Sequence, residues 1–189
     1  MKLIRTASSG DAASIARLYN YYVQNTMVTF EEEPVSEREM ARRIDDITGQ
    51  YPWLVYEDDG IITGFAYAGK WKGRSAYRYT VESTVYVDQH VRSRGIGTAL
   101  YSQLLDALRE DGLHLVIAGI AMPNPASQAL HEHFGFRKVG EFTEIYSYIT
   151  RLFYYSGSLT RASLMVVFIV SIETGLCKKA MGFVFLASS

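Results

Sequence analysis

A short basic run that contains two glycines, RSRGIG at residues 92–97, stands between a segment that favours a strand and one that favours a helix. The first turn of a helix directs unpaired backbone N–H groups and the positive end of the helix dipole at one point in space. A phosphate or pyrophosphate binds readily at such a point. Gly95 and Gly97 would let the backbone approach this ligand, and Arg92 and Arg94 would add positive charge at its rim. The alternative is a tight turn with solvated arginines.

Glu82 stands in the segment TVESTVYV (80–87), whose β-branched and aromatic residues favour a strand. A carboxylate buried in a strand is costly unless it has a partner or a chemical task. Burial raises its pKa towards neutrality, which suits a base that deprotonates an ammonium group directly or through a water. The alternative is a carboxylate that faces solvent or pairs with Arg78.

His131 lies four residues before Gly135, in a segment that begins with Asn124 and Pro125. Asparagine is a favourable helix N-cap and proline a favourable first helical residue, so a helix is expected here. An imidazole with a pKa near its unperturbed value of about 6.5 can donate a proton at neutral pH. A surface position on the polar side of the helix is the alternative for His131.

Composition restricts the class of protein. The chain has 189 residues, 48% of them hydrophobic and 21% charged, with a net charge of −1. This length suits one domain, and the balanced charge gives no basic field for nucleic acid. The single Cys177 excludes an internal disulfide and a multi-cysteine zinc site, and it suits a reducing compartment. We therefore expect no metal site and no nucleic-acid partner.

The apolar segments do not indicate export or a membrane. The opening residues, MKLIRTASSGD, become polar before the apolar region of a signal peptide forms. The most apolar run, at residues 162–172, is too short to span a bilayer. We expect a cytoplasmic protein that does not enter a membrane.

Hydrophobic period and capping residues predict the elements that hold these side chains. A strand is expected at residues 2–6, followed by a helix whose S-x-x-D capping box starts at Ser8. A second helix is expected at 36–49. The apolar segments 53–57 and 61–69 flank the turn sequence DDG, which predicts a β-hairpin.

The second half of the chain alternates strands and helices. The strand at 80–87 leads through the glycine turn into a helix that ends near Gly112. The nearly continuous apolar run at 113–121 is typical of a central strand buried on both faces. A helix at 124–135 and a strand at 136–142 follow.

This order of elements resembles the GNAT N-acetyltransferase superfamily. Its acetyl-CoA signature, R/Q-x-x-G-x-G/A after a strand, is matched at residues 92–97, and NPASQALHEHFGF resembles its second CoA motif. The segments TFEEEP, YPWLV, YAGKWKGRSAY, TVESTVYV and LHEHFGF resemble the phosphinothricin N-acetyltransferase subfamily, which acetylates small amino acids and their sulfone, sulfoximine or phosphinate analogues. The resemblance covers residues 1–142.

The resemblance implies one α/β (α+β) domain with the GNAT fold, in which helices flank a mixed, mostly antiparallel sheet. It implies acetyl-CoA as co-substrate and direct attack of a neutral amine on the thioester, with Glu82 as base and His131 as acid beside the CoA sulfur. The backbone of residues 85–87 would hold the pantetheine amides as an added strand does. The residues expected to bind CoA are Val85, Tyr86, Val87, Arg92, Arg94, Gly95, Ile96, Gly97, Thr98 and Asn124.

For the acceptor, the resemblance places Lys72, Arg74 and Tyr77 around an anionic group and makes Phe30 an apolar wall. A lysine and an arginine two residues apart can clasp a carboxylate or phosphinate, whereas a solvated basic loop is the alternative. The expected acceptor is a small amino acid or analogue, and the expected assembly is a homodimer. Two other functions stay open: acetylation of another amine, such as a polyamine or a protein N-terminus, and acyl-CoA binding without catalysis.

The resemblance stops after Phe142. The family continues with a glycine- and lysine-containing loop and an R-W-x-D-type strand, which this chain lacks. One interpretation is a divergent tail with strands near 146–155 and 164–172 that finish the sheet; another is a shifted reading frame or altered terminus. We therefore divide the chain into a GNAT domain at 1–142 and a divergent segment at 143–189 that partly completes the sheet or is disordered.

Overall fold

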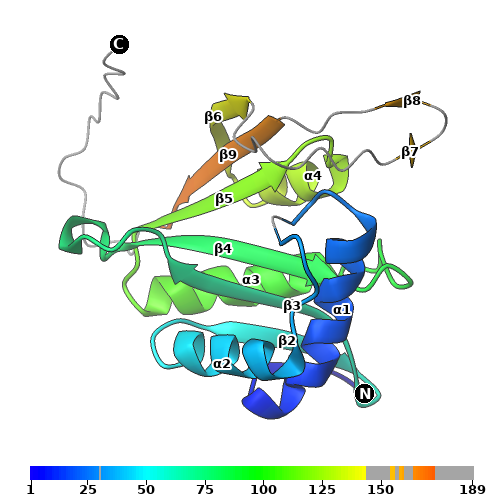
Figure 1. The fold of residues 1–189 in the computed structure, drawn as a ribbon. Helices are drawn as coiled ribbons and strands as arrows, with labels where there is room; N and C mark the ends of the chain where they lie inside the picture. The colour runs from blue at the N-terminus through cyan, green and yellow to red at the C-terminus, as the bar shows by residue number, and fades with distance from the viewer. Residues whose placement is uncertain (30, 144–153, 156–157, 160–163, 173–189) are drawn as a thin grey trace.

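The computed structural model describes residues 1–29, 31–143, 154–155, 158–159 and 164–172 (Figure 1). Its centre is a seven-stranded sheet in the order β1-β2-β3-β4-β5-β9-β6, in which only β4 and β5 are parallel neighbours. The strands of the sheet are β1 (Lys2–Thr6), β2 (Trp53–Asp58), β3 (Ile61–Lys70), β4 (Thr80–Val87), β5 (Leu115–Ala121), β6 (Arg137–Thr143) and β9 (Leu164–Ser171). The predicted fold class, a mixed and mostly antiparallel sheet with flanking helices, is confirmed.

Helices cover both faces of the sheet (Figure 1). One hydrophobic cluster joins α1 and α2 to β2 and β3, and a second joins α3 to β3, β4, β5 and β9. Gly64 lets α3 pack closely on β3, because a Cβ at this residue would lie 2.9 Å from Ile96 Cγ2. The helices are α1 (Ala12–Asn25), α2 (Glu37–Thr48), α3 (Ile96–Glu110) and α4 (Pro125–His133), with 3-10 turns η1 (Ser9–Asp11) and η2 (Ser75–Tyr77).

The local signals in the sequence set the helix ends. Ser36 Oγ accepts a hydrogen bond from the Glu39 amide (3.2 Å), and Asn124 Oδ1 accepts one from the Ser127 amide (3.2 Å). Gly112 and Gly135 follow α3 and α4 with φ angles of 73° and 79°, which favour glycine. None of the helices in the described ranges is long and apolar enough to cross a bilayer.

The strand predicted at 113–121 begins two residues later, at Leu115. The amides of Leu113 and His114 donate to the carbonyls of Leu108 and Tyr79, so these two residues close the turn after α3 before the strand begins. The other strands predicted before residue 143 lie within two residues of their expected positions.

The strand predicted near 164–172 is present as β9, but it lies inside the sheet between β5 and β6 and leaves β6 at the edge. Val166, Val167 and Phe168 are buried there. β5 is an apolar strand, so it is expected to have a paired strand on each side. β9 pairs with it on the side away from β4, over seven residue pairs. The strand predicted near 146–155 falls mostly outside the described residues; β7 (Tyr154–Tyr155) pairs with β8 (Ser158–Leu159) in a separate two-stranded sheet.

The strands β4 and β5 part after a short pairing. In the described part of the chain, their parallel register joins Thr80–Glu82 to Leu115–Ile117 and goes no further. Both strands then continue, to Val87 and to Ala121, with a gap between them. This gap is where a ligand can enter the sheet.

We expect Phe168→Ala to lower the free energy of unfolding by about 3–5 kcal/mol, because it leaves a cavity in a packed core. Phe168 is 1% exposed, whereas Phe142 on the neighbouring strand is 48% exposed, so Phe142→Ala is the matched control and should change stability little. Urea unfolding monitored by circular dichroism measures both. A small effect of Phe168→Ala would contradict the placement of β9 in the core.

Candidate active site

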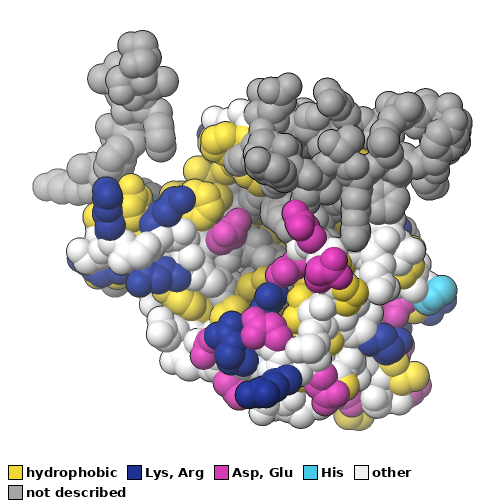
Figure 2. Space-filling model, viewed as in Figure 1, with side chains coloured by type: hydrophobic (Ala, Val, Ile, Leu, Met, Phe, Trp, Pro, Cys, Tyr) yellow, Lys and Arg dark blue, Asp and Glu magenta, His cyan; other side chains and the backbone are white. Residues whose placement is uncertain are grey.

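The gap between β4 and β5 opens into a cleft of about 1030 Å³. Residues 82–87 of β4 and 119–121 of β5 line its walls, and the glycine turn and α4 line one end. Residues of α1 and of the segment that follows α1 line the rest of the cleft. Acidic side chains gather near the middle of the face drawn in Figure 2, with Lys and Arg side chains beside them.

The backbone of β4 offers hydrogen-bonding groups to this cleft. The Asp88 amide donates to the Thr63 carbonyl of β3 (2.8 Å), and successive residues of a strand direct their backbone groups to alternate sides. Val85 and Val87 therefore direct theirs into the gap, where the Tyr22 hydroxyl donates to the Val87 carbonyl. Tyr86 directs its backbone to β3, which corrects the expectation that all three residues offer backbone groups; its ring lines the cleft instead.

The glycine turn has the geometry of an anion cradle. Gly95 is the N-cap residue of α3 and has a φ angle of 77°, which a residue with a side chain adopts only with strain. The guanidinium of Arg92 lies 5.5 Å from the centre of the Tyr22 ring and contacts the Tyr22 hydroxyl (3.4 Å). Arg94 is exposed and does not line the cleft. The first helical N–H groups thus face the cleft beside one arginine.

Gly97 lies in the first turn of α3 and lines the cleft. A Cβ atom at this residue would lie 3.5 Å from Leu130 Cδ2 and 3.7 Å from Val87 Cγ2, which are ordinary contact distances. The fold itself therefore has room for a larger residue here. The space beside Gly97 is therefore open to a ligand in the cleft.

Glu82 is the last residue of β4 that pairs with β5, and the gap between the two strands begins directly after it. It is exposed to the cleft, which corrects the expectation of a buried carboxylate. The protein around the carboxylate nevertheless removes part of its hydration and raises its pKa, while the positive charge of Lys72 opposes this shift. An ion pair with Arg78 is not formed, because Arg78 lies over the Tyr79 ring and donates to the Ser75 carbonyl.

Gly119 gives Glu82 room on the β5 side. The Glu82 Oε1 atom would lie 3.8 Å from a Cβ at Gly119, on the neighbouring strand. A carboxylate with a raised pKa that faces an open cleft can accept a proton from a bound ammonium group.

His131 is 3% exposed and lies on α4 at the edge of the cleft. Its Nδ1 atom is 2.7 Å from the Ser127 carbonyl, which can only accept, so Nδ1 carries a proton. Its Nε2 atom is 2.7 Å from the Tyr101 hydroxyl. Burial lowers the pKa of His131, so the ring is mainly neutral at pH 7 and not the freely titrating imidazole expected from the sequence.

The acceptor residues inferred from the resemblance lie on the connection between β3 and β4. Lys72, Arg74 and Tyr77 are exposed and do not line the cleft, although Lys72 is near enough to Glu82 to lower the pKa of that carboxyl. Phe30 lies outside the described residues. Asn124 lines the cleft and also caps α4.

Sequence reasoning missed the side chains that line the part of the cleft beyond Glu82. They are mostly aromatic or hydroxyl-bearing: Tyr19, Thr29, Glu31, Tyr67 and Thr84. The Tyr19 and Thr29 hydroxyls are 2.6 Å apart, and Glu31 pairs with Arg43 (2.7 Å). A helical or alternating pattern does not distinguish such residues from ordinary core aromatics.

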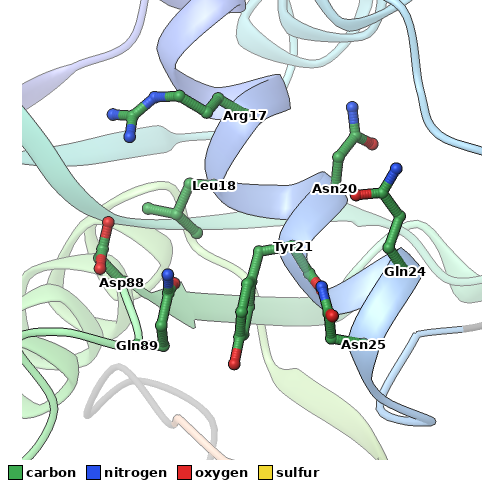
Figure 3. A pocket seen from close by; sticks show the side chains of 8 residues that line it. All are labelled: Arg17, Leu18, Asn20, Tyr21, Gln24, Asn25, Asp88 and Gln89. Atoms are coloured by element: carbon green, nitrogen blue, oxygen red, sulfur yellow. The ribbon is translucent and has the colours of Figure 1, made fainter.

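A second, smaller cavity of about 430 Å³ lies between α1 and the segment after β4 (Figure 3). Asn20, Tyr21 and Gln24 project from α1 beside Asp88 and Gln89. This cavity shares no lining residue with the cleft, and none of the residues inferred from the sequence lines it. Among the residues the structure describes, no group of three His, Cys, Asp or Glu side chains is placed to hold a metal ion.

Comparison with known proteins identifies the family. The acetyltransferase (GNAT) domain model matches residues 4–154. A phosphinothricin N-acetyltransferase of Streptomyces viridochromogenes is 40% identical over 137 residues, which is 72% of this chain and 75% of that protein. The chain belongs to the GNAT acetyltransferase family.

Other relatives of this acetyltransferase agree. The L-methionine sulfoximine/L-methionine sulfone acetyltransferase of Salmonella typhimurium is 35% identical over 144 residues, 75% of this chain and 84% of that one. A phosphinothricin acetyltransferase from Sinorhizobium meliloti, solved in complex with acetyl-CoA, superposes with a TM-score of 0.82 at 33% identity, covering 97% of this chain and 95% of that one. The family predicted from the sequence is confirmed, and the chain is an N-acetyltransferase.

We expect Lys72→Gln in this acetyltransferase to raise the pKa of Glu82 further, because the ammonium group favours the ionised carboxylate. Lys70→Gln removes an equal charge from the end of β3, and Lys70 does not contribute to the shift at Glu82. Carbon-13 NMR titration of the Glu82 carboxyl measures both variants. A Glu82 pKa that falls or stays constant in Lys72→Gln would contradict this electrostatic coupling.

Proposed function

We propose that the protein transfers the acetyl group of acetyl-CoA to the amino group of a small amino acid or analogue, of the phosphinothricin, methionine sulfone or methionine sulfoximine type. One observation carries this proposal: β4 and β5 part directly after Glu82, so the gap runs from a base with a raised pKa to the N-terminus of α3. Relatives named for these acceptors support the substrate class.

The residues present fit acetyl-CoA. The first helical N–H groups after Gly95 would bind the pyrophosphate, with Arg92 beside them. The backbone groups of Val85 and Val87 would bind the amides of the pantetheine arm in the manner of an added strand. Arg94, Ile96, Gly97, Thr98 and Asn124 remain proposed contacts, and Tyr86 would contribute its ring. Acetyl-CoA supplies the activated acyl group.

Glu82 would act as the base. An amino acid arrives as an ammonium ion and must lose a proton before its nitrogen can attack the thioester carbonyl. A raised pKa brings the carboxylate closer to the pKa of the group that it must deprotonate. The proton passes to Glu82 directly or through a water in the open cleft, and then to solvent.

For the acceptor, Lys72, Arg74, Tyr77 and Phe30 remain proposed substrate residues. Lys72 is the best supported, because its charge acts on Glu82. The hydroxyls of Tyr19 and Tyr67 add polar groups at this part of the cleft. A larger cationic amine is the second candidate acceptor, because the carboxylate of Glu31 also lines this part of the cleft. Glu31 is already paired with Arg43, however, and this ion pair favours a small acceptor that carries its own anionic group.

Three further expectations remain proposals. The division at residue 142 separates the motifs that resemble the family from the tail, although β9 of the tail pairs within the same sheet. A homodimer and a cytoplasmic location follow from the resemblance and from the single cysteine. His131 is retained as the source of the proton for the leaving sulfur.

An acceptor panel tests the proposed function. We expect acetylation of at least one of phosphinothricin, methionine sulfone and methionine sulfoximine, measured as free CoA release and confirmed by mass spectrometry of the product. Glu82→Gln is the control for catalysis: it should keep acetyl-CoA binding and lose turnover about 100-fold or more. If none of the three amines reacts while a polyamine or a peptide N-terminus does, the substrate class is wrong. Acetyl-CoA binding without turnover of any amine would indicate a binding module.

Gly97→Ala tests the cofactor end of the cleft. We expect a melting temperature equal to or slightly above that of the parent, because alanine favours a helix by about 0.5–1 kcal/mol over glycine and the added methyl fits. We expect acetyl-CoA affinity to fall at least 10-fold in calorimetry, because the methyl would occupy the ligand's space. Unchanged affinity would place the pyrophosphate elsewhere.

A further inference from the structure

A buried hydrogen-bond chain connects the cleft to His131. Ser83 Oγ is 2.6 Å from the Tyr101 hydroxyl, and this hydroxyl is 2.7 Å from His131 Nε2. The three residues are 6%, 0% and 3% exposed, and they come from β4, α3 and α4. Ser83 and His131 line the cleft, while Tyr101 lies behind them. A buried polar chain of this kind is costly unless each of its members has a hydrogen-bond partner.

The protonation state of His131 sets the direction of these bonds. The Ser127 carbonyl keeps a proton on Nδ1, so a neutral ring has a bare Nε2 that accepts from Tyr101. The Tyr101 oxygen then accepts from Ser83. Each hydroxyl proton points away from the cleft in this state, and none is offered to a ligand.

Protonation of His131 reverses the chain. Nε2–H now donates to the Tyr101 oxygen, and the Tyr101 hydroxyl in turn donates to Ser83 Oγ. The hydroxyl proton of Ser83 is then released from Tyr101, and it can turn to the Ile117 carbonyl (3.4 Å) or into the cleft, which Ser83 lines. The Ser83 proton is therefore directed to Tyr101 when the imidazole is neutral and can be offered to the cleft when the imidazole is protonated.

We propose that Ser83, Tyr101 and His131 form a proton relay to the departing thiolate, with Ser83 Oγ as the terminal donor. This rests on the proposed acetyl transfer. As the C–S bond breaks and its electron pair moves to sulfur, Ser83 gives its proton to sulfur. Ser83 takes the Tyr101 proton, and Tyr101 takes the Nε2 proton of His131. His131 ends neutral, and its Nε2 regains a proton from water in the cleft by the reverse path through Ser83 and Tyr101, so one proton is used and one restored in each turnover.

The surroundings of the imidazole suit this role. Its neighbours are the rings of Tyr101, Phe136 and Phe168, from α3, the segment after α4, and β9. Among the described residues packed around it, Tyr101 is the one titratable side chain, and Glu82 points to the opposite side of β4 from Ser83. Burial lowers the pKa of His131, which makes its protonated form a stronger acid than a solvated imidazolium.

Kinetics against pH test the relay. We expect Tyr101→Phe and Ser83→Ala to lower kcat about 10-fold to 100-fold at pH 7 with KM for acetyl-CoA unchanged. The loss should shrink above about pH 9, because a thiol with a pKa of about 8.5 then leaves as a thiolate without a donor. The double variant should be no slower than the slower single variant. Tyr51→Phe, which removes a hydroxyl beside the same hydrophobic cluster but away from the cleft, is the matched control.

Nitrogen-15 NMR of the His131 ring gives a readout that does not depend on activity. The free protein at pH 8 should show a protonated Nδ1 and a bare, hydrogen-bonded Nε2, and Tyr101→Phe should shift the Nε2 resonance. A protonated Nε2 in the neutral ring would overturn the relay, as would normal kcat in both variants or a loss that is equal at every pH. If the parent protein acetylates no amine, the proposed function fails and the relay with it; an active parent with unaffected variants removes the relay alone.

Discussion

The early end of the pairing between β4 and β5 is the constraint on which the site depends. Two strands that stop pairing leave backbone groups that need other partners. Here the Tyr22 hydroxyl donates a hydrogen bond to the Val87 carbonyl, and Ser83 Oγ lies 3.4 Å from the Ile117 carbonyl. The outer sides of the two strands are held by seven residue pairs each, to β3 and to β9. The gap is therefore part of the folded state, and a ligand does not have to open the sheet.

This gap also fixes the distances of the chemistry. Glu82 lies where the pairing ends, and Val87 lies five residues further along β4, or about 16 Å at 3.3 Å per residue. Glu82 and the glycine turn, the proposed base and the proposed anion site, are thus held near the two ends of one strand. Glu82 and Ser83 are consecutive residues of β4, so their side chains lie on opposite faces of the strand. In the proposed reaction, proton removal from the acceptor and proton delivery to sulfur would therefore use different faces of the same strand.

Local signals predicted much of this arrangement. Caps at Ser36 and Asn124, the glycine turn, and the strand periods identified the elements, because each depends on neighbouring residues. The exposure of Glu82 and the burial of His131 were not predicted, since both depend on how β4, β5 and α4 meet. The position of β9 inside the sheet was also missed, because strand order cannot be read from a strand's own residues. Tyr19 and Tyr67, which line the cleft, come together only in the folded chain.

We propose that the gap between β4 and β5 binds the pantetheine arm and presents the thioester to Glu82. A crystal structure of the complex with acetyl-CoA tests it most directly. We expect pantetheine amides bonded to the backbone of Val85 and Val87, and the pyrophosphate on the N–H groups after Gly95. The thioester carbonyl should lie near enough to Glu82 for an amine to fit between them. A pantetheine arm bound outside the gap, or a thioester on the far side of β4 from Glu82, would contradict it.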